Sequence, residues 1–263
     1  MLVASQSATG IVSLIAAGVV VSFINSISGG GSVLSLPLLI FLGLPSAVAN
    51  GTNRFGVLMG SLGSLAGFRS QGMLLPRQTW QVGWPGALGA VLGSVFAVKL
   101  PDRFFNPVLA VIILFVVTMT FRGHGVTAKI ATVPKVRTDW PANLIYACIG
   151  FYGGFIQAGS GLIMIYAFSQ MTNLDIFRIN SLKVSNTILF ISMSLITFIA
   201  AGKIDWAMAI ALGMGNLVGG WAGSHWQVRK GSVWVNRFLL LTGIAIAAKL
   251  LWDTWVAWMQ RSG

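Results

Sequence analysis

Acidic side chains are scarce in this sequence, which contains five aspartates and no glutamate among its 263 residues. The aspartates stand at or near the ends of expected helices, with no histidine at a spacing that would build a catalytic site: Asp102, Asp139, Asp175, Asp205 and Asp253. An enzyme needs a nucleophile, an acid or base, or a set of metal ligands within reach of its substrate. We therefore expect that the protein is not an enzyme. The same scarcity disfavours a transporter of cations or metals.

Residues that bind metals or form disulfides are equally few. The single cysteine, Cys148, excludes an internal disulfide and makes a cysteine-based metal site implausible. The two histidines, His124 and His225, lie too far apart in sequence to suggest a ligand pair. We expect neither a metal site nor a bound cofactor.

Charged residues of either sign make up only 8% of the chain, against about 25% in soluble domains. Stretches with few or no charges recur, and most approach the roughly 20 apolar residues that a membrane-spanning helix needs: residues 10–53, 55–68, 78–98, 104–121, 140–174, 184–202, 206–228 and 238–251. We therefore predict an all-α integral membrane protein with about eight hydropathy segments, surrounded by the lipid bilayer.

The charges that are present are mostly positive, with 17 lysines and arginines and a formal net charge of +12. One interpretation is that these cations set the topology and contact anionic lipids in cytoplasmic loops. The other is that a few of them lie inside the membrane and attract an anion, and both interpretations can hold. The basic residues are scattered between apolar segments, so we expect no nucleic-acid partner.

One long polar stretch, residues 122–141, divides the apolar sequence into halves of similar length. Sliding one half against the other by about 129 residues aligns "SGGGSVL" with "QAGSGLI" and "NGTNRFGV" with "INSLKVSN". We predict a first transmembrane repeat over residues 1–121, a basic cytoplasmic linker over 122–141 and a second transmembrane repeat over 142–263.

The distribution of basic loops indicates how each repeat crosses the membrane. If residues 10–44 and 140–174 turn back inside the bilayer, with glycines and Pro37 as helix breakers, most basic loops fall on one side, as the positive-inside rule requires. Each repeat is then a re-entrant hairpin plus three transmembrane helices. The two repeats are inverted, as is common in secondary transporters, with both termini outside.

The glycine breaks are the first candidate site. Non-helical backbone at membrane depth is tolerated only where protein or a water-filled cavity surrounds it. Helices that restart after such a break direct free N–H groups and the positive ends of their dipoles at one point, and this arrangement suits an anion. The alternative is that these glycines only allow close helix packing, as those in residues 86–94 and 213–223 are expected to do. The candidate residues are Ser28, Gly29, Gly30, Gly31, Ser32, Gln157, Gly159, Ser160 and Gly161.

The second candidate site is a pair of cations at matching places in the two halves, Arg54 and Lys183. An intramembrane cation is costly and indicates function, and two such cations facing two donor segments would form a pseudo-symmetric anion site. The alternative is that both side chains extend to the membrane interface. The neutral donors beside them are Thr52, Asn53, Asn180 and Ser181.

The segments "SGGGSVLSLPLLIFLGLPSAVANGTNR" and "NSLKVSN", with the repeated four-segment plan, resemble the sulfite exporter TauE/SafE family of bacterial membrane permeases over almost the whole chain. The resemblance implies a multi-pass protein of the bacterial inner membrane that transports small anions such as sulfite, sulfonates or other sulfur oxyanions by alternating access. The expected direction of transport is export. The alternative is a membrane assembly or lipid-contact protein without a transport path, which the aromatic-rich "LLWDTWVAWMQ" would fit.

Overall fold

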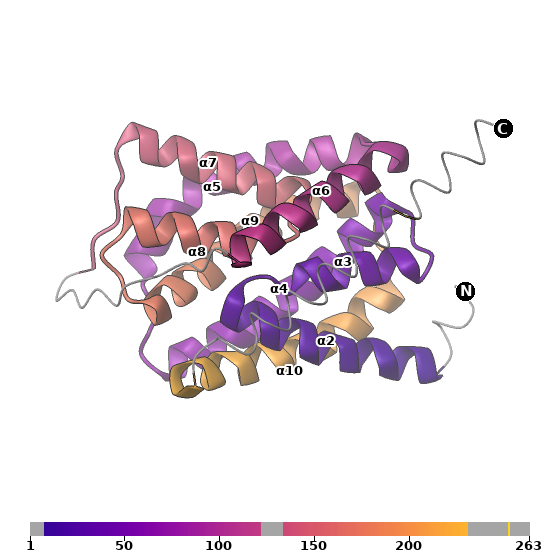
Figure 1. Cartoon of the computed structure of the whole chain (residues 1–263), viewed down its shortest axis with the longest axis horizontal. Helices are drawn as coiled ribbons and strands as arrows, with labels where there is room; N and C mark the ends of the chain where they lie inside the picture. The colour runs from indigo at the N-terminus through magenta and orange to yellow at the C-terminus, as the bar shows by residue number, and fades with distance from the viewer. Residues whose placement is uncertain (1–7, 122–133, 231–251, 253–263) are drawn as a thin grey trace.

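The computed structural model describes residues 8–121, 134–230 and 252, which form helices joined by short turns (Figure 1). The described helices of the first half are α2 (Ala8–Ser28), α3 (Ser32–Phe41), α4 (Ser46–Ser70), α5 (Pro76–Lys99) and α6 (Asp102–Phe121). Those of the second half are α7 (Trp140–Phe155), α8 (Ser160–Met171), α9 (Ile176–Ala200) and α10 (Trp206–Lys230). The predicted all-helical fold is confirmed, whereas most of the predicted linker and the last apolar segment, 238–251, lie outside the described residues.

Three of these helices are long and apolar enough to cross a membrane: Thr9–Ser28, Pro76–Lys99 and Ile176–Ala200. Large apolar side chains cover the outside of the bundle, and on α5 the exposed fractions of Leu88, Leu92 and Phe96 are 61%, 60% and 63%. A monomer in water rarely leaves so continuous an apolar face exposed. Polar side chains lie inside the bundle instead, and Arg54, in the first half of α4, is fully buried.

Each glycine break is followed by a helix too short to span a bilayer. With 10 and 12 residues, α3 and α8 are about 15 and 18 Å long, against a hydrocarbon core of about 30 Å. The ends of the second hairpin lie side by side, because the N–H of Arg137, before α7, donates to the carbonyl oxygen of Met171, at the end of α8, at 3.1 Å. Figure 1 shows that α3 likewise runs back along α2.

The breaks themselves differ in detail from the expectation. Pro37, expected to be a breaker, lies inside α3, so the glycines alone end α2. The second break has no proline, yet it leaves four residues between α7 and α8, of which Gln157 and Gly159 have left-handed φ values of 66° and 71°. Backbone conformation, and not proline, interrupts both helices.

Glycines bring helices of opposite halves into backbone contact. A Cβ atom added at Gly89 of α5 would lie 2.8 Å from the backbone nitrogen of Phe151 in α7, and one added at Gly219 of α10 would lie 2.8 Å from the carbonyl carbon of Val19 in α2. Small residues that allow such close approach are a main source of helix association in lipid. The close packing predicted for residues 86–94 and 213–223 is therefore confirmed. The long helix α5 packs against the hairpin of the second half, and the long helix α10 packs against the hairpin of the first half.

The central helices α4 and α9 run antiparallel. Arg54 of α4 contacts Ser194 and the ring of Phe198 in α9, whereas Gly51, earlier in α4, approaches Phe198 and Lys203, later in the chain. An antiparallel arrangement of these two helices is compatible with the inverted repeat, which stays a prediction. Helix α6 contributes Leu109 to the apolar cluster that also contains Leu36 of α3.

Candidate functional site

The two glycine breaks meet at the centre of the molecule with their backbones in contact. A Cβ atom added at Gly29 would lie 2.5 Å from the carbonyl carbon of Gly161, and one added at Gly161 would lie 2.5 Å from the carbonyl oxygen of Gly29. Gly29 also has a left-handed φ of 78°, which side chains disfavour. Only glycine fits at either position without displacing the opposite hairpin.

Ser32, the first residue of α3, joins the first hairpin to the second break. Its hydroxyl donates to the carbonyl oxygen of Gln157 at 3.2 Å and accepts from the N–H of Gly159 at 3.2 Å. Gln157 is not a glycine, so its left-handed backbone is strained, and such strain of about 1–3 kcal/mol is typical of functional sites. A side chain of one half therefore holds the irregular backbone of the other.

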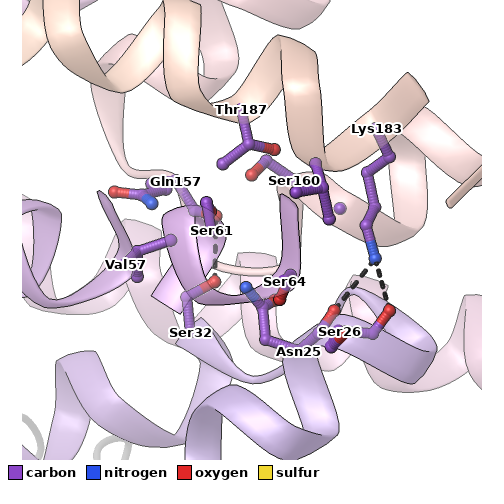
Figure 2. A pocket seen from close by; sticks show the side chains of 12 residues that line it. Asn25, Ser26, Ser32, Val57, Ser61, Ser64, Gln157, Ser160, Lys183 and Thr187 are labelled. Carbon is purple, nitrogen blue, oxygen red and sulfur yellow. Dashed lines mark hydrogen bonds between the residues drawn. The ribbon is translucent and has the colours of Figure 1, made fainter. Parts of the chain in front are cut away.

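A small polar cavity lies beside this contact (Figure 2). About 10 Å³ of it is open to the centres of water-sized molecules, which is room for about one water. A larger ligand would require the walls to separate. The cavity is lined by six hydroxyl-bearing residues and six others: Asn25, Ser26, Ser32, Val57, Ser61, Ser64, Gln157, Ser160, Gly161, Lys183, Val184 and Thr187.

Lys183 of α9 supplies the positive charge on the cavity wall. The residue is 2% exposed, and its ammonium group donates to the carbonyl oxygens of Asn25 at 2.9 Å and Ser26 at 3.1 Å (Figure 2). An ammonium group has three N–H donors, so these two bonds leave one donor for a ligand. No carboxylate is present among the described residues that line the cavity.

Arg54 of α4 is buried more completely, and the protein engages both of its terminal nitrogens, whereas its buried Nε has no hydrogen-bond partner among the described residues. One terminal nitrogen donates to the carbonyl oxygen of Gly153 at 3.0 Å and to Ser194 at 2.8 Å, and the other donates to the carbonyl oxygens of Gly154 and Phe155 at 2.5 and 3.2 Å. The guanidinium also lies 4.6 Å from the centre of the Phe198 ring. Within the described part of the chain, Arg54 is not a lining residue of the cavity.

The two cations have the same type of partner. The last carbonyl groups of an α-helix lack donors within the helix and carry the negative end of its dipole. Lys183 binds these carbonyls at the end of α2, and Arg54 binds them at the end of α7. Each cation therefore stabilises the broken end of the hairpin helix that belongs to the other half.

The structure gathers part of the predicted site around the cavity. The predicted residues that line it are Ser32, Gln157, Ser160, Gly161 and Lys183. Those that belong to the ends and turns of the breaks without lining it are Ser28, Gly29, Gly30, Gly31 and Gly159. The remaining predicted residues lie in buried helix contacts: Thr52, Asn53, Arg54, Asn180 and Ser181. Thr52, for example, accepts a hydrogen bond from the N–H of Asp205 at 2.9 Å.

Several lining residues were not predicted. Ser61 and Ser64 come from the middle of α4, and Thr187 comes from the middle of α9. The signal that could have found Ser61 and Ser64 is their spacing of three positions on an apolar helix, which places both hydroxyl groups on one face. Ser26 was also not predicted. In the structure its hydroxyl is buried without a hydrogen-bond partner among the described residues.

The aspartates serve helix ends. The carboxylate of Asp175 accepts hydrogen bonds from the N–H groups of Phe177 and Arg178, both at 3.0 Å, and that of Asp205 accepts from Met208 at 3.0 Å. Such N-terminal caps satisfy donors that the helix itself leaves free. The expected placement at or near helix ends is confirmed for the described aspartates: Asp102, Asp139, Asp175 and Asp205.

Comparisons with known proteins agree over nearly the full chain. The family model described as "Sulfite exporter TauE/SafE" matches residues 14–250. A probable membrane transporter protein, ORF9, from Sinorhizobium sp is 25% identical over 91% of this chain and 92% of its own length. A probable membrane transporter protein from Haemophilus influenzae is 26% identical over 91% and 94%, and one named YfcA from Escherichia coli K12 is 25% identical over 88% and 86%. No solved structure matches the chain significantly.

Proposed function

The chain belongs to the sulfite exporter TauE/SafE family of membrane transporters, and from that premise we propose that it carries small sulfur oxyanions or sulfonates across the bacterial inner membrane. The observation that carries the proposal is the central cavity, where Lys183 and hydroxyl groups from both halves converge between the two hairpins. A buried cation costs free energy and indicates a functional site in a membrane protein. Neutral hydroxyl donors suit the several oxygen atoms of such an anion.

The helices around the cavity add a favourable field. Ser32 begins α3, and Ser160 and Gly161 begin α8, and all three residues line the cavity. The N-terminal ends of both short helices, which carry partial positive charge, thus face the same space. The arrangement favours an anion over a cation.

Alternating access is the mechanism that fits a site of this size. The cavity holds about one water, so a sulfur oxyanion enters only when the walls part. The contact of Gly29 with Gly161 and the hydrogen bonds of Ser32 are the links between the hairpins at this point. We propose that these links open toward one side at a time, while Lys183 and the hydroxyl groups follow the anion.

The cavity also bears on the alternative of a membrane assembly protein without a transport path. A transport path requires a polar space of this kind, bounded by residues of both breaks, whereas a protein that only contacts lipids or partners does not require one. Burying polar groups that are not fully hydrogen-bonded costs free energy, and a transport site is a reason to retain them.

Counterflow in proteoliposomes tests the proposal. The purified protein is reconstituted in vesicles loaded with sulfite, sulfoacetate, thiosulfate or sulfate, and uptake of the same labelled anion is followed. We expect accelerated uptake of at least one sulfite or sulfonate relative to protein-free vesicles. Rates equal to those of protein-free vesicles for every anion would contradict the proposed function.

A further inference from the structure

We propose that the cavity selects anions that carry a single negative charge, because Lys183 is the one cation that it offers to a ligand within the described structure. This inference rests on the proposed function and concerns the charge of the substrate. It follows from the different ways in which the two buried cations are used.

The charge available to a ligand is small. Of the residues that line the cavity in the described structure, only Lys183 is ionisable. Arg54, the matching cation, has both terminal nitrogens engaged by carbonyl and hydroxyl oxygens of the protein. The nearest aspartates in the chain, Asp175 and Asp205, bind backbone N–H groups at helix starts. A bound monoanion would therefore be neutralised by one ammonium group.

A second negative charge would meet no second side-chain cation in the described structure, only the partial positive charge at the start of α3 and α8. The cost of moving an ion out of water rises with the square of its charge, so a dianion loses far more hydration than a monoanion. Hydroxyl groups recover part of this loss but carry no net charge. Moreover, the carbonyl oxygens of Asn25 and Ser26, which share the wall with Lys183, present negative partial charge.

The hydroxyl groups supply recognition of oxygen atoms without adding charge. Ser26 is placed next to the Lys183 ammonium group, and its hydroxyl has no partner among the described residues. Ser61, Ser160 and Thr187 lie on the other walls of the same cavity (Figure 2). A tetrahedral or pyramidal group with several oxygens and one charge, such as a sulfonate or hydrogensulfite, matches this set.

A comparison of the affinities of several anions for the unaltered protein is the primary test. In detergent, the affinities of methanesulfonate, sulfate, thiosulfate and sulfite are measured by isothermal titration. We expect methanesulfonate to bind about tenfold or more tightly than sulfate and thiosulfate. Sulfite gains its proton near neutral pH, so its affinity relative to that of methanesulfonate at the same pH should rise as the pH falls from 8 to about 6.

Two variants link anion binding to the lysine. Lys183→Gln should weaken methanesulfonate binding about tenfold or more. It should weaken sulfate binding at least as much, because a cation attracts a dianion more strongly than a monoanion. The matched control is Lys99→Gln, which removes the same charge from an exposed position at the end of α5 and should leave both affinities unchanged.

The outcomes separate the two proposals. Sulfate or thiosulfate binding as tightly as methanesulfonate would overturn the single-charge preference and leave anion transport standing. Binding of none of these anions would overturn the proposed function itself. If Lys183→Gln does not fold, the measurements on the unaltered protein still decide the preference.

Discussion

Arg54 and Lys183 stand 129 residues apart in the sequence, at matching places in α4 and α9, but the surroundings of their side chains differ. Both bind the carbonyl end of a hairpin helix in the opposite half. Arg54 uses both terminal nitrogens in this way, whereas Lys183 retains a donor and faces a cavity. The comparison indicates that both cations cap the end of a helix. Lys183 makes fewer hydrogen bonds than Arg54, so Lys183 is the cation that can also bind a ligand.

The chemistry of the two side chains explains the division. A guanidinium is a planar fork with five donors and suits several fixed oxygens at once, whereas an ammonium is a compact charge with three donors. Gly153, Gly154 and Phe155 present three carbonyl oxygens to Arg54. Only two carbonyl oxygens face Lys183. The protein thus occupies both terminal nitrogens of Arg54, whereas one donor of Lys183 remains for a ligand.

The largest effect is expected when Arg54 is replaced by Gln. The carbonyl groups of Gly153 and Gly154 would lose their charged donor inside the protein, and hydrogen bonds to charged groups contribute about 1.5–3 kcal/mol each. We expect a fall in the free energy of unfolding of about 3 kcal/mol or more, measured as a large drop in the thermal midpoint in detergent. Arg54→Lys should recover part of it. A stable Arg54→Gln protein that has lost anion binding would instead place Arg54 in the substrate site.

The contact that brings each cation to the opposite hairpin is tested by Gly161→Ala. The new Cβ atom would overlap the carbonyl oxygen of Gly29 at 2.5 Å, and overpacking of this kind costs about 1–3 kcal/mol. We expect lower thermal stability and loss of counterflow. The control is Gly153→Ala, because its Cβ atom would meet only the Ser160 Cβ, at 4.0 Å. Equal behaviour of the two variants would show that the hairpins are not held at Gly161.

Exchange of the two cation types sharpens the comparison further. In Lys183→Arg the charge and the bonds to Asn25 and Ser26 can persist, so we expect stability within about 1.5 kcal/mol of the unaltered protein. The larger guanidinium would fill the cavity, which has room for about one water. Counterflow should therefore fall about tenfold or more without unfolding. Full transport by this variant would show that the cavity does not need the lysine's shape.

An exposed cation provides the smallest expected effect. Arg137 binds Asp139 at 2.6 Å in a pair open to solvent, and its hydrogen bond holds the pKa of Asp139 below the ordinary value. A lowered folded-state pKa contributes stability at neutral pH that is lost as the pH falls through that pKa. Asp139→Asn should flatten this acid-side loss and leave the thermal midpoint at neutral pH unchanged within error. A drop as large as that of Arg54→Gln would erase the distinction between buried and exposed cations.

Much of the fold could be predicted from local sequence. Apolar length predicts the helices, consecutive glycines predict the first break, and aspartates mark helix starts because their carboxylates satisfy free N–H groups. The matched positions of Arg54 and Lys183 were also visible, because the cost of a membrane cation makes each one conspicuous. Pro37 was misread, since a proline in a short helix removes one hydrogen bond without ending the helix there.

The sequence by itself thus indicated that the chain lies in the membrane, that glycines break two of its helices, and that Arg54 and Lys183 are candidates for burial. Only the tertiary structure decided that Arg54 closes the end of α7 while Lys183 faces a cavity, and that Ser61, Ser64 and Thr187 join its walls. The physical reason is that these partners are far apart in sequence, and the backbone carbonyls that capture Arg54 have no signature in the residue types that carry them. Packing of one half against the other sets which donors remain free.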